Sequence, residues 1–519
     1  MKKTFKRLSA LLFCISLILI SCTEKKEDKS LPRSVPEAEG VSSKAIITFL
    51  DSAAANTRTE FHSFMLLRHG KVIAEGWWDP YRPDLIHTMY SASKSFTSTA
   101  VGFAVKEKKL SIEDQVISFF PDKLPDSISP NLEQLKVKHL LMMSTGQRRE
   151  PPTTTQDWVK SYLETPVDFE PGSRYRYSSL ATFMLSAIVQ KVSGEKVIDF
   201  LTPRLFEPLD IEGMDWETAP GDINTGGWGL RVKTEDMAKL GQLYLNKGKW
   251  NGKQLLPEEW VEEATSLKIQ QRPELTQEQR ESSLDDVQGY CYQFWRARHN
   301  SYQANGAFGQ FILIIPEKDA VVVFTANSND MWGELDMVWK YLYPSMKDDP
   351  LPADEGSVTQ LKQRLASLAL PLPPKNSNEA ITSKISGKSF TLAENNRSIK
   401  NLTFQFSNDV CLLNIKTDAA SFDLSFGSGK WEMGETLRHG PSIFATAVNS
   451  LNGLPPFKIA GAYTWKDDQS LELTLRYIES VHNEIMNFRF EDNKVFVDFP
   501  GATGPAFRKI PPIEGTIAE

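Results

Sequence analysis

The chain changes character near residue 380, and no other feature constrains its fold as strongly. Before that point, segments with apolar residues at helical spacing are interleaved with segments of strand-like alternation. After it, short alternating segments follow one another between Asn and Gly turns, at the spacing of an antiparallel sandwich or small barrel. The clearest of these segments are 402–406, 410–415, 421–426, 471–477, 485–490 and 494–499.

We therefore expect two folded domains, which also suits a chain of 519 residues, since that length exceeds what a single core normally serves. The first domain is expected over 35–343 and the second, all-β, over 381–519. A proline-rich stretch with one short helix, 344–380, is expected to link them. The formal net charge of −7 argues against nucleic acid as a partner.

Within the first domain, alternation over 64–73 predicts two strands joined by a turn at His69-Gly70-Lys71. A second antiparallel pair is expected over 311–315 and 320–325. Helical spacing of apolar residues is found over 96–105, 180–192 and 234–245. The first domain is therefore expected to be α/β (α+β), with an antiparallel sheet accompanied by helices.

The most distinctive chemical motif is Ser91-x-x-Lys94, at the head of the helical segment 96–105. Residues three apart on a helix share a face, so the hydroxyl and the amine are expected side by side at the helix N-terminus. A serine hydroxyl needs a neighbour to take its proton, and a lysine does this once burial or a nearby group lowers its pKa. Free backbone N–H groups at the helix start would stabilise an oxyanion. Ser91 is therefore a candidate nucleophile and Lys94 its base.

The motif alone is weak evidence, because a second copy, Ser193-Gly194-Glu195-Lys196, follows the helical segment 180–192. We interpret that copy as a turn between two helices. For the first copy, the alternative is an N-cap serine followed by a solvated lysine.

Three further segments of the first domain carry candidate groups. Tyr177 lies where the loop 171–176 opens a helix; its hydroxyl would either reach a nucleophile or pack at the helix start, and the residues leave both open. The segment 304–310 leads into a strand, and a backbone N–H there is a candidate second oxyanion donor. Three glycines within 226–229 indicate a close approach of the backbone to another segment.

Other residues with reactive side chains are interpreted as structural. His139 lies inside an apolar segment of helical period, where a histidine is usually structural. Cys291 and Cys411 fall in different domains, without a CxxC partner or a His cluster nearby. A disulfide is therefore not indicated, and no metal or other cofactor is expected.

The N-terminus predicts export from the cytoplasm. Four cations precede the apolar run 8–20, which has the charge and length of a secretory signal. The run ends in Leu19-Ile20-Ser21-Cys22, which resembles the lipobox of bacterial lipoproteins. By that resemblance 1–22 is a signal peptide, Cys22 carries the lipid, and 23–34 tethers the protein to a membrane of the cell envelope, facing the periplasm or the cell surface.

Three motifs occur in the order typical of class C β-lactamases and penicillin-binding proteins: Ser91-x-x-Lys94, Tyr177-x-Ser179 and Ala304-x-Gly306. Over 35–342 the chain resembles this superfamily of serine hydrolases. The resemblance implies an antiparallel sheet flanked by helices plus an all-helical region, as in β-lactamases and transpeptidases. The second domain is similar to the lipocalin-like domain often appended to such hydrolases.

The resemblance also implies roles for individual residues. Ser91 would be acylated by the substrate carbonyl, and Lys94 and Tyr177 would share the proton transfers. The backbone N–H groups of Ser91 and Ala307 would form the oxyanion hole. The positions expected to contact substrate are Ser179, Asn305 and Gly306.

Two departures from the family pattern bear on the substrate. Ser179 replaces the usual asparagine, and Ala304 replaces the usual lysine or histidine, so the cation that receives a β-lactam carboxylate is missing. We therefore expect an esterase or amidase acting on small ester or amide substrates, closer to the family's carboxylesterases and nylon-oligomer hydrolases than to true β-lactamases. The alternatives are a D-amino-acid peptidase, a β-lactamase or penicillin-binding activity, and a catalytically idle lipoprotein that recognises a ligand. The oligomeric state is left open.

Overall fold

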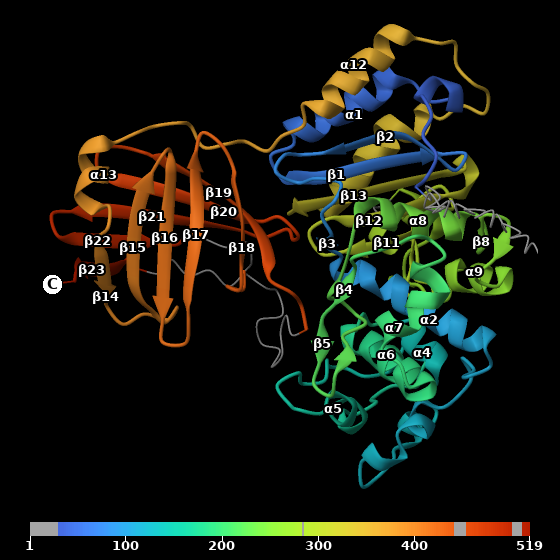
Figure 1. Ribbon diagram of the computed structural model, residues 1–519. Helices are drawn as coiled ribbons and strands as arrows, with labels where there is room; N and C mark the ends of the chain where they lie inside the picture. Colours follow the sequence, from blue (N-terminus) through green and yellow to red (C-terminus); the bar gives the residue numbers. More distant parts are fainter. Residues whose placement is uncertain (1–29, 283–284, 441–452, 501–510, 519) are drawn as a thin grey trace, which may run out of the picture. The chain divides into compact units, whose positions relative to one another are not determined.

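The computed structural model describes residues 30–282, 285–440, 453–500 and 511–518 (Figure 1). Leu31–Glu519 form one compact unit. The predicted signal peptide with Cys22, and most of the expected tether, lie outside the described residues. Among the helices that are described, none combines the length and apolar character needed to cross a bilayer.

A six-stranded antiparallel sheet forms the centre of the first domain, with strand order β10-β11-β12-β13-β1-β2. The expected turn between the first two strands is confirmed. His69 and Gly70 have φ values of 50° and 72°, as tight hairpin turns require. The strands are β1 (Thr59–Arg68), β2 (Lys71–Trp77), β10 (Trp295–Arg296), β11 (Tyr302–Gly306), β12 (Gln310–Ile315) and β13 (Ala320–Ser328).

Side chains of this sheet alternate between two apolar cores. On one face, Met65 and Leu67 of β1 join the core around α2 and α8. On the other face, Phe64 and Leu66 join the core that contains residues of α1 and α12. Because both faces are covered, the central strands read as nearly continuous apolar runs. The four helices are α1 (Ser43–Ala55), α2 (Ser93–Lys106), α8 (Thr234–Leu245) and α12 (Glu355–Ala366).

The remaining helices of the first domain lie mainly on the α2 side of the sheet (Figure 1), except that Leu335 places the helix 331–337 in the core on the α1 side. The second Ser-x-x-Lys copy is the turn that was predicted: α6 ends at Ser193, and Lys196 pairs with Asp222 at the surface. These helices are α3 (Pro130–Glu133), α4 (Val137–Leu141), α5 (Trp158–Glu164), α6 (Ser179–Ser193), α7 (Val197–Leu201), α9 (Glu258–Thr265), α10 (Gln277–Glu281) and α11 (Met331–Met337).

Short strands close the loops around α2. Strands β8 and β9 pair as a tight hairpin at Trp250. A three-stranded sheet, β3-β7-β4, ties the segment just before Ser91 to the segment after the glycine loop 226–229. These strands are β3 (His87–Thr88), β4 (Asp215–Trp216), β5 (Thr218–Ala219), β6 (Ile223–Asn224), β7 (Leu230–Val232), β8 (Lys249–Trp250) and β9 (Lys253–Gln254).

The second domain is a closed barrel, which decides between the two all-β architectures that were expected. Nine strands form a ring in the order β17-β16-β15-β14-β23-β22-β21-β20-β19, and a parallel pairing of β17 with β19 closes it. A tenth strand, β18, adds to β19. The strands, preceded by α13 (Glu379–Ile385), are β14 (Ser389–Leu392), β15 (Ile399–Ser407), β16 (Val410–Thr417), β17 (Ser421–Ser428), β18 (Glu432–Thr436), β19 (Phe457–Trp465), β20 (Ser470–Tyr477), β21 (Asn483–Glu491), β22 (Lys494–Asp498) and β23 (Ile513–Ile517).

Strand β19 has a glycine at its centre because another strand approaches it there. A Cβ on Gly461 would lie 2.1 Å from the carbonyl oxygen of Ser425 in β17. The barrel can therefore close only because residue 461 is a glycine and has no side chain. All six strands predicted for this domain are present, whereas β14, β18, β19 and β23 were not foreseen.

Part of the expected linker 344–380 packs on the first domain. Leu361 of α12, together with Leu368 and Leu370, is buried in the same apolar core as α1. The proline-rich stretch after Leu370 then leads to α13.

Buried ion pairs join barrel strands to the first domain. Arg476 of β20 forms two hydrogen bonds with the carboxylate of Glu60 in β1, at 2.6 and 3.0 Å. Although burial favours the neutral acid, His62 and Arg476 lower the pKa of Glu60 to about 2. Arg231 of β7, almost fully buried, pairs with both Asp215 and Glu479, the latter in the turn after β20.

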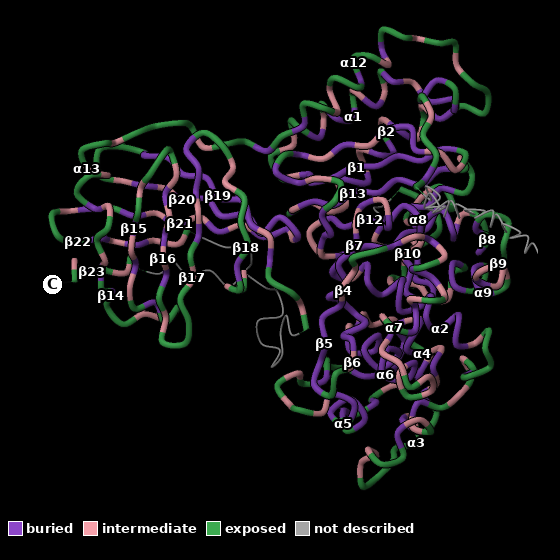
Figure 2. The backbone as a smooth tube through the Cα atoms, viewed as in Figure 1, coloured by how far each residue is buried: buried purple, intermediate pink, exposed green. Residues whose placement is uncertain are grey.

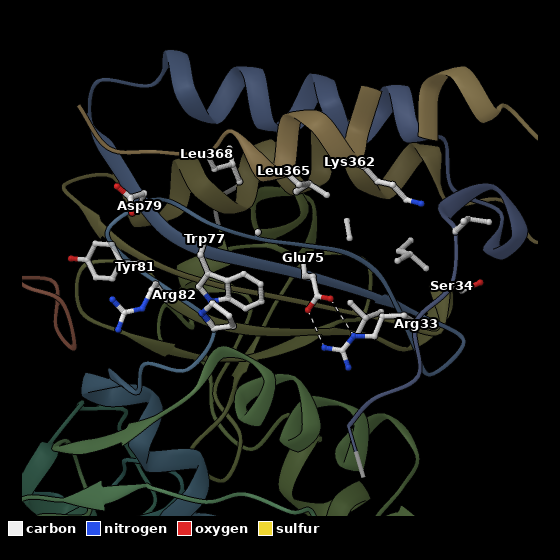
Figure 3. Close-up of a pocket in the computed structure, with 17 residues that line it drawn as sticks. Arg33, Ser34, Glu75, Trp77, Asp79, Tyr81, Arg82, Lys362, Leu365 and Leu368 are labelled. Atoms are coloured by element: carbon white, nitrogen blue, oxygen red, sulfur yellow. Dashed lines mark hydrogen bonds and ion pairs between the residues drawn. The ribbon is translucent and has the colours of Figure 1, made fainter. Parts of the chain in front are cut away.

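A hollow of about 790 Å³ runs along the edge strand β2 beneath α12 (Figure 3). Trp77, Leu365 and Leu368 contribute apolar surface to it, and an ion pair between Arg33 and Glu75 spans 3.0 Å at its side. None of the candidate catalytic residues is among the described residues that line it. It is therefore separate from the site described below.

We predict that Arg476→Ala lowers the free energy of unfolding by about 2–3 kcal/mol, because the mostly buried Glu60 carboxylate loses its arginine partner and keeps only the contact with His62. The measurement is the urea midpoint. The control is Lys494→Ala, since Lys494 and Glu514 form an ion pair that is about half exposed and worth less than about 1 kcal/mol. Equal midpoints for the two variants would contradict the prediction.

Candidate active site

Ser91 lies in a 3₁₀ turn, Tyr90–Ala92, that leads directly into α2. Every residue of α2 from Ser93 to Ala104 is buried, as Figure 2 shows for this central region of the domain. The polar side chains on this buried helix bond to the backbone of surrounding loops. Ser95 donates to Gln293 and Thr97 donates to Gly226, at 2.7 and 2.9 Å. The helix and its loops are thereby fixed relative to one another.

The amine of Lys94 is buried beside the Ser91 hydroxyl, with 3.0 Å between Nζ and Oγ. Nζ also donates to the Gly227 carbonyl at 2.6 Å and to the Ser179 hydroxyl at 3.1 Å. The alternative of a solvated lysine after an N-cap serine is therefore wrong: Lys94 is only 2% exposed, and Ser91 caps no helix through its side chain.

Burial lowers the pKa of Lys94 to about 7. The carboxylate of Glu150, which accepts a hydrogen bond from the Leu180 N–H, acts in the opposite direction. At neutral pH a large share of Lys94 is therefore the free amine. A free amine that donates to Gly227 and Ser179 has its lone pair left for the Ser91 proton.

Tyr177 is brought to the same place by the start of α6. The Lys94 amine lies over its ring, 4.8 Å from the centroid. Burial raises the pKa of the Tyr177 hydroxyl, and an interaction with the Ser91 side chain offsets this only in part. The Tyr177 hydroxyl therefore keeps its proton at neutral pH, and its interaction with the Ser91 side chain favours the alternative in which it reaches the nucleophile.

Ser179 and Gly227 complete the surroundings of the amine. Ser179 is the first residue of α6, whose N-cap Ser178 accepts from the Ala181 N–H at 3.1 Å. The close backbone approach predicted for 226–229 is to the start of α6, where a Cβ on Gly227 would lie 2.6 Å from the Ser179 carbonyl oxygen. This approach places the Gly227 carbonyl where it accepts from Lys94. The sequence indicated that the glycine segment packs closely against something, but not that it touches the lysine.

Two backbone N–H groups, those of Ser91 and Ala307, point away from the turns that contain them. The Tyr90 carbonyl accepts from the Ser93 N–H, and so it points into the start of the helix. The Ser91 N–H belongs to the same trans peptide as that carbonyl. It therefore points the opposite way, out of the helix start. The Gly306 carbonyl accepts from the Gly309 N–H inside a turn, so the Ala307 N–H points away from that turn. A Cβ on Gly306 would lie 2.1 Å from the Met89 carbonyl oxygen, which shows how closely the two segments run.

The first residue of the motif Ala304-x-Gly306 is apolar and packs near the start of α2. Ala304 is buried in the same core as Met89 and Ala92, where the longer cation of related sequences is absent. Asn305 alternates to the other face of β11, and its side-chain nitrogen has no partner among the described residues. Two of the three expected substrate contacts therefore have partners within the protein. Ser179 bonds to Lys94, and Gly306 packs against Met89.

An aromatic wall stands beside Tyr177 and was missed from the sequence. The ring of Trp295 lies 5.7 Å from that of Tyr177 and 5.1 Å from that of Tyr290, measured between centroids. Trp332 of α11 continues the wall, 6.1 Å from Trp295. These aromatic residues lie in separate short segments, with Trp295 in the two-residue strand β10 and Trp332 in α11, so no sequence spacing links them and only the fold brings them together.

The residues interpreted as structural have structural partners. The His139 ring accepts from the Lys136 N–H at 3.1 Å at the start of α4. Cys291 and Cys411 are buried free thiols. Among the described residues, no group of three or more His, Cys, Asp and Glu side chains is arranged to hold a metal ion.

Curated proteins similar to this chain include enzymes. The 6-aminohexanoate-dimer hydrolase of Paenarthrobacter ureafaciens is 24% identical over 286 residues, covering 50% of this chain and 71% of the relative. A beta-lactamase of Escherichia coli strain K12 is 20% identical over 323 residues, covering 51% and 81%. Among solved structures, the octameric penicillin-binding protein homologue from Pyrococcus abyssi is 16% identical with a TM-score of 0.47, covering 91% of this chain and 99% of that one.

A family model decides the assignment. The model described as Beta-lactamase matches residues 53–340, more than half of the chain. The match begins in α1 and ends after α11, and so contains the sheet, α2 and the whole of the site described above. The chain therefore belongs to the beta-lactamase family of serine hydrolases.

Proposed function

We propose that the protein hydrolyses small ester or amide bonds through an acyl-enzyme on Ser91. The observation that carries the proposal is the buried Lys94 amine, 3.0 Å from the Ser91 hydroxyl and held by two further partners. Lys94 takes the Ser91 proton as the hydroxyl attacks the substrate carbonyl, and the N–H groups of Ser91 and Ala307 stabilise the oxyanion. A proton then passes to the leaving group, and water hydrolyses the acyl-enzyme.

Lys94 and Tyr177 take different parts in these transfers. The pKa of Lys94, about 7, suits a general base near neutral pH. Burial raises the pKa of Tyr177, so its hydroxyl keeps its proton until it donates that proton to the leaving group. Lys94 then passes to Tyr177 the proton that it took from Ser91. Burial thus makes Lys94 the base and Tyr177 the acid, because it lowers the pKa of the first and raises the pKa of the second.

The substrate is proposed to lack the carboxylate of a β-lactam. Ala304 offers no cation, and the Ser179 hydroxyl is engaged with Lys94. The aromatic wall of Tyr177, Tyr290 and Trp295 favours an apolar or aromatic acyl group. A linear amide is the second substrate class, supported by the similarity to a 6-aminohexanoate-dimer hydrolase.

Replacing the nucleophile tests the proposal. We predict that the wild type hydrolyses p-nitrophenyl butyrate, with little cleavage of a chromogenic cephalosporin, and that Ser91→Ala lowers the ester rate by about a thousandfold or more. A fluorophosphonate probe should label the wild type and not this variant. Ser193→Ala, in the second Ser-x-x-Lys copy, is the matched control and should retain activity and labelling. Rapid cephalosporin turnover would contradict the substrate class, and unchanged ester turnover in Ser91→Ala would contradict the nucleophile.

The pH dependence tests the base. A protonated Lys94 cannot accept the Ser91 proton, so kcat/KM for the ester should rise with pH through about 7 and level off above about 8. Lys94→Met should lose about a thousandfold in rate and this limb of the profile. Lys196→Met, whose lysine pairs with Asp222 at the surface, is the control. A profile that is flat from pH 5.5 to 8.5 would exclude Lys94 as the base.

We further propose that the protein is a lipoprotein of the bacterial cell envelope, facing the periplasm or the cell surface. The cations and apolar run before Leu19-Ile20-Ser21-Cys22 support this. In cells, the wild type should fractionate with membranes, and Cys22→Ala should leave a larger, unprocessed or soluble species. Incorporation of labelled palmitate by the wild type but not by the variant checks the assignment; equal incorporation by both would reject it.

A further inference from the structure

The turn that joins β20 to β21 reaches out of the barrel and contacts the segments around Ser91. The Glu479 carbonyl accepts from the Thr88 N–H at 2.9 Å, three residues before Ser91. The Ser480 carbonyl accepts from the Tyr81 hydroxyl at 3.0 Å. Ile478 and Val481 of the same turn are each 1% exposed. The turn is therefore an embedded part of the hydrolase domain rather than a loose loop.

The last residue of this turn, His482, forms a ring cluster with Tyr90 and Phe308. The Tyr90 hydroxyl and His482 Nε2 are hydrogen-bonded, and the two rings lie edge to face with centroids 6.0 Å apart. His482 lies edge to face with Phe308 as well, at 5.9 Å, and Tyr90 and Phe308 are 5.6 Å apart. Each ring thus contacts the other two, and His482 and Tyr90 are nearly buried.

Tyr90 and Phe308 are the immediate neighbours of the two candidate oxyanion donors. Tyr90 precedes Ser91, and the peptide between them carries the Ser91 N–H. Phe308 follows Ala307 in the turn whose Gly306–Gly309 hydrogen bond orients the Ala307 N–H.

Both aromatic residues have left-handed backbones, with φ of 45° for Tyr90 and 66° for Phe308. Side chains of this size disfavour that region, so such conformations persist only where surrounding contacts hold them. The one side chain that contacts both rings from outside these two segments is His482, among the ring contacts of the described residues.

We infer that His482, contributed by the barrel, is a positioning residue that holds the Ser91 and Ala307 N–H groups in place for the tetrahedral intermediate. The inference rests on the proposed function of the Ser91 site. We assign His482 no contact with the reacting atoms or the substrate. It acts through Tyr90 and Phe308, and it gives the barrel a part in the chemistry of the first domain.

The hydrogen bond has a definite direction. Burial lowers the pKa of His482 to about 4, so the ring is neutral at neutral pH and accepts at Nε2. Burial raises the pKa of the Tyr90 hydroxyl, which therefore keeps its proton and donates it. A phenyl ring in place of the imidazole would keep the edge-to-face packing and lose only this bond.

The test compares His482→Phe with the wild type, using the full chain and p-nitrophenyl butyrate. We expect kcat to fall by about tenfold with KM within about twofold, because a misplaced oxyanion donor affects the transition state and not substrate binding. The affinity for phenylboronic acid, whose adduct with serine is tetrahedral, should fall by a similar factor. His482→Gln, which keeps an acceptor, should recover most of the loss. His439→Phe replaces an exposed barrel histidine and should change nothing.

A second variant guards against a purely structural effect. Tyr90→Phe removes the same bond from the other side, so it should show the same loss of kcat, and the double variant should lose no more than either single one. Unchanged kcat and boronate affinity in His482→Phe and Tyr90→Phe would overturn the inference, as would fully additive losses. Failure of the proposed function is distinguishable, because then Ser91→Ala itself would keep its ester turnover.

Discussion

The buried amine of Lys94 is the interaction on which the hydrolase domain depends. An ammonium or amine taken out of water is unfavourable unless its hydrogen-bonding groups find partners. Here three segments far apart in the sequence each supply one: the turn at Ser91, the first residue of α6 at Ser179, and the glycine loop at Gly227. The hydroxyls along α2 fasten the surrounding loops in the same way. A side chain that would be solvated elsewhere thus sets the relative places of two helices and a loop.

The same burial gives the site its chemical asymmetry. It brings the pKa of Lys94 down to about 7 and moves that of Tyr177 upward, so one group gives up its proton readily and the other retains it. The rings of Tyr177, Tyr290 and Trp295 pack against one another beside this amine. Electrostatics and packing are therefore two aspects of one arrangement, and neither is independent of the sheet and helices that carry it.

Local patterns in the sequence predicted what depends on local physics. The hairpin at His69-Gly70, the end of α6 at Ser193 and six barrel strands follow from turn chemistry and from periodicity. The Ser91, Lys94 and Tyr177 constellation was predicted by combining helical spacing with a family resemblance. What escaped prediction depends on distant partners: β19 has the low-propensity centre Ala-Gly-Ala because β17 approaches Gly461, and Trp295 acquires its place only when the loops have assembled. His482 was not singled out, because it lies nearly four hundred residues from Tyr90.

The burial of two barrel residues in the sheet's own core has a consequence for how the protein unfolds. Ala460 and Ile478 belong to the same apolar cluster as Phe61, Phe324 and Trp78. A chain that ended before the barrel would leave that cluster open to solvent on one side, so the boundary near residue 380 marks a change of architecture but not of cooperative unit. The two architectures are thermodynamically coupled, and loosening of the barrel would be felt at the strand that carries Glu60 and His62.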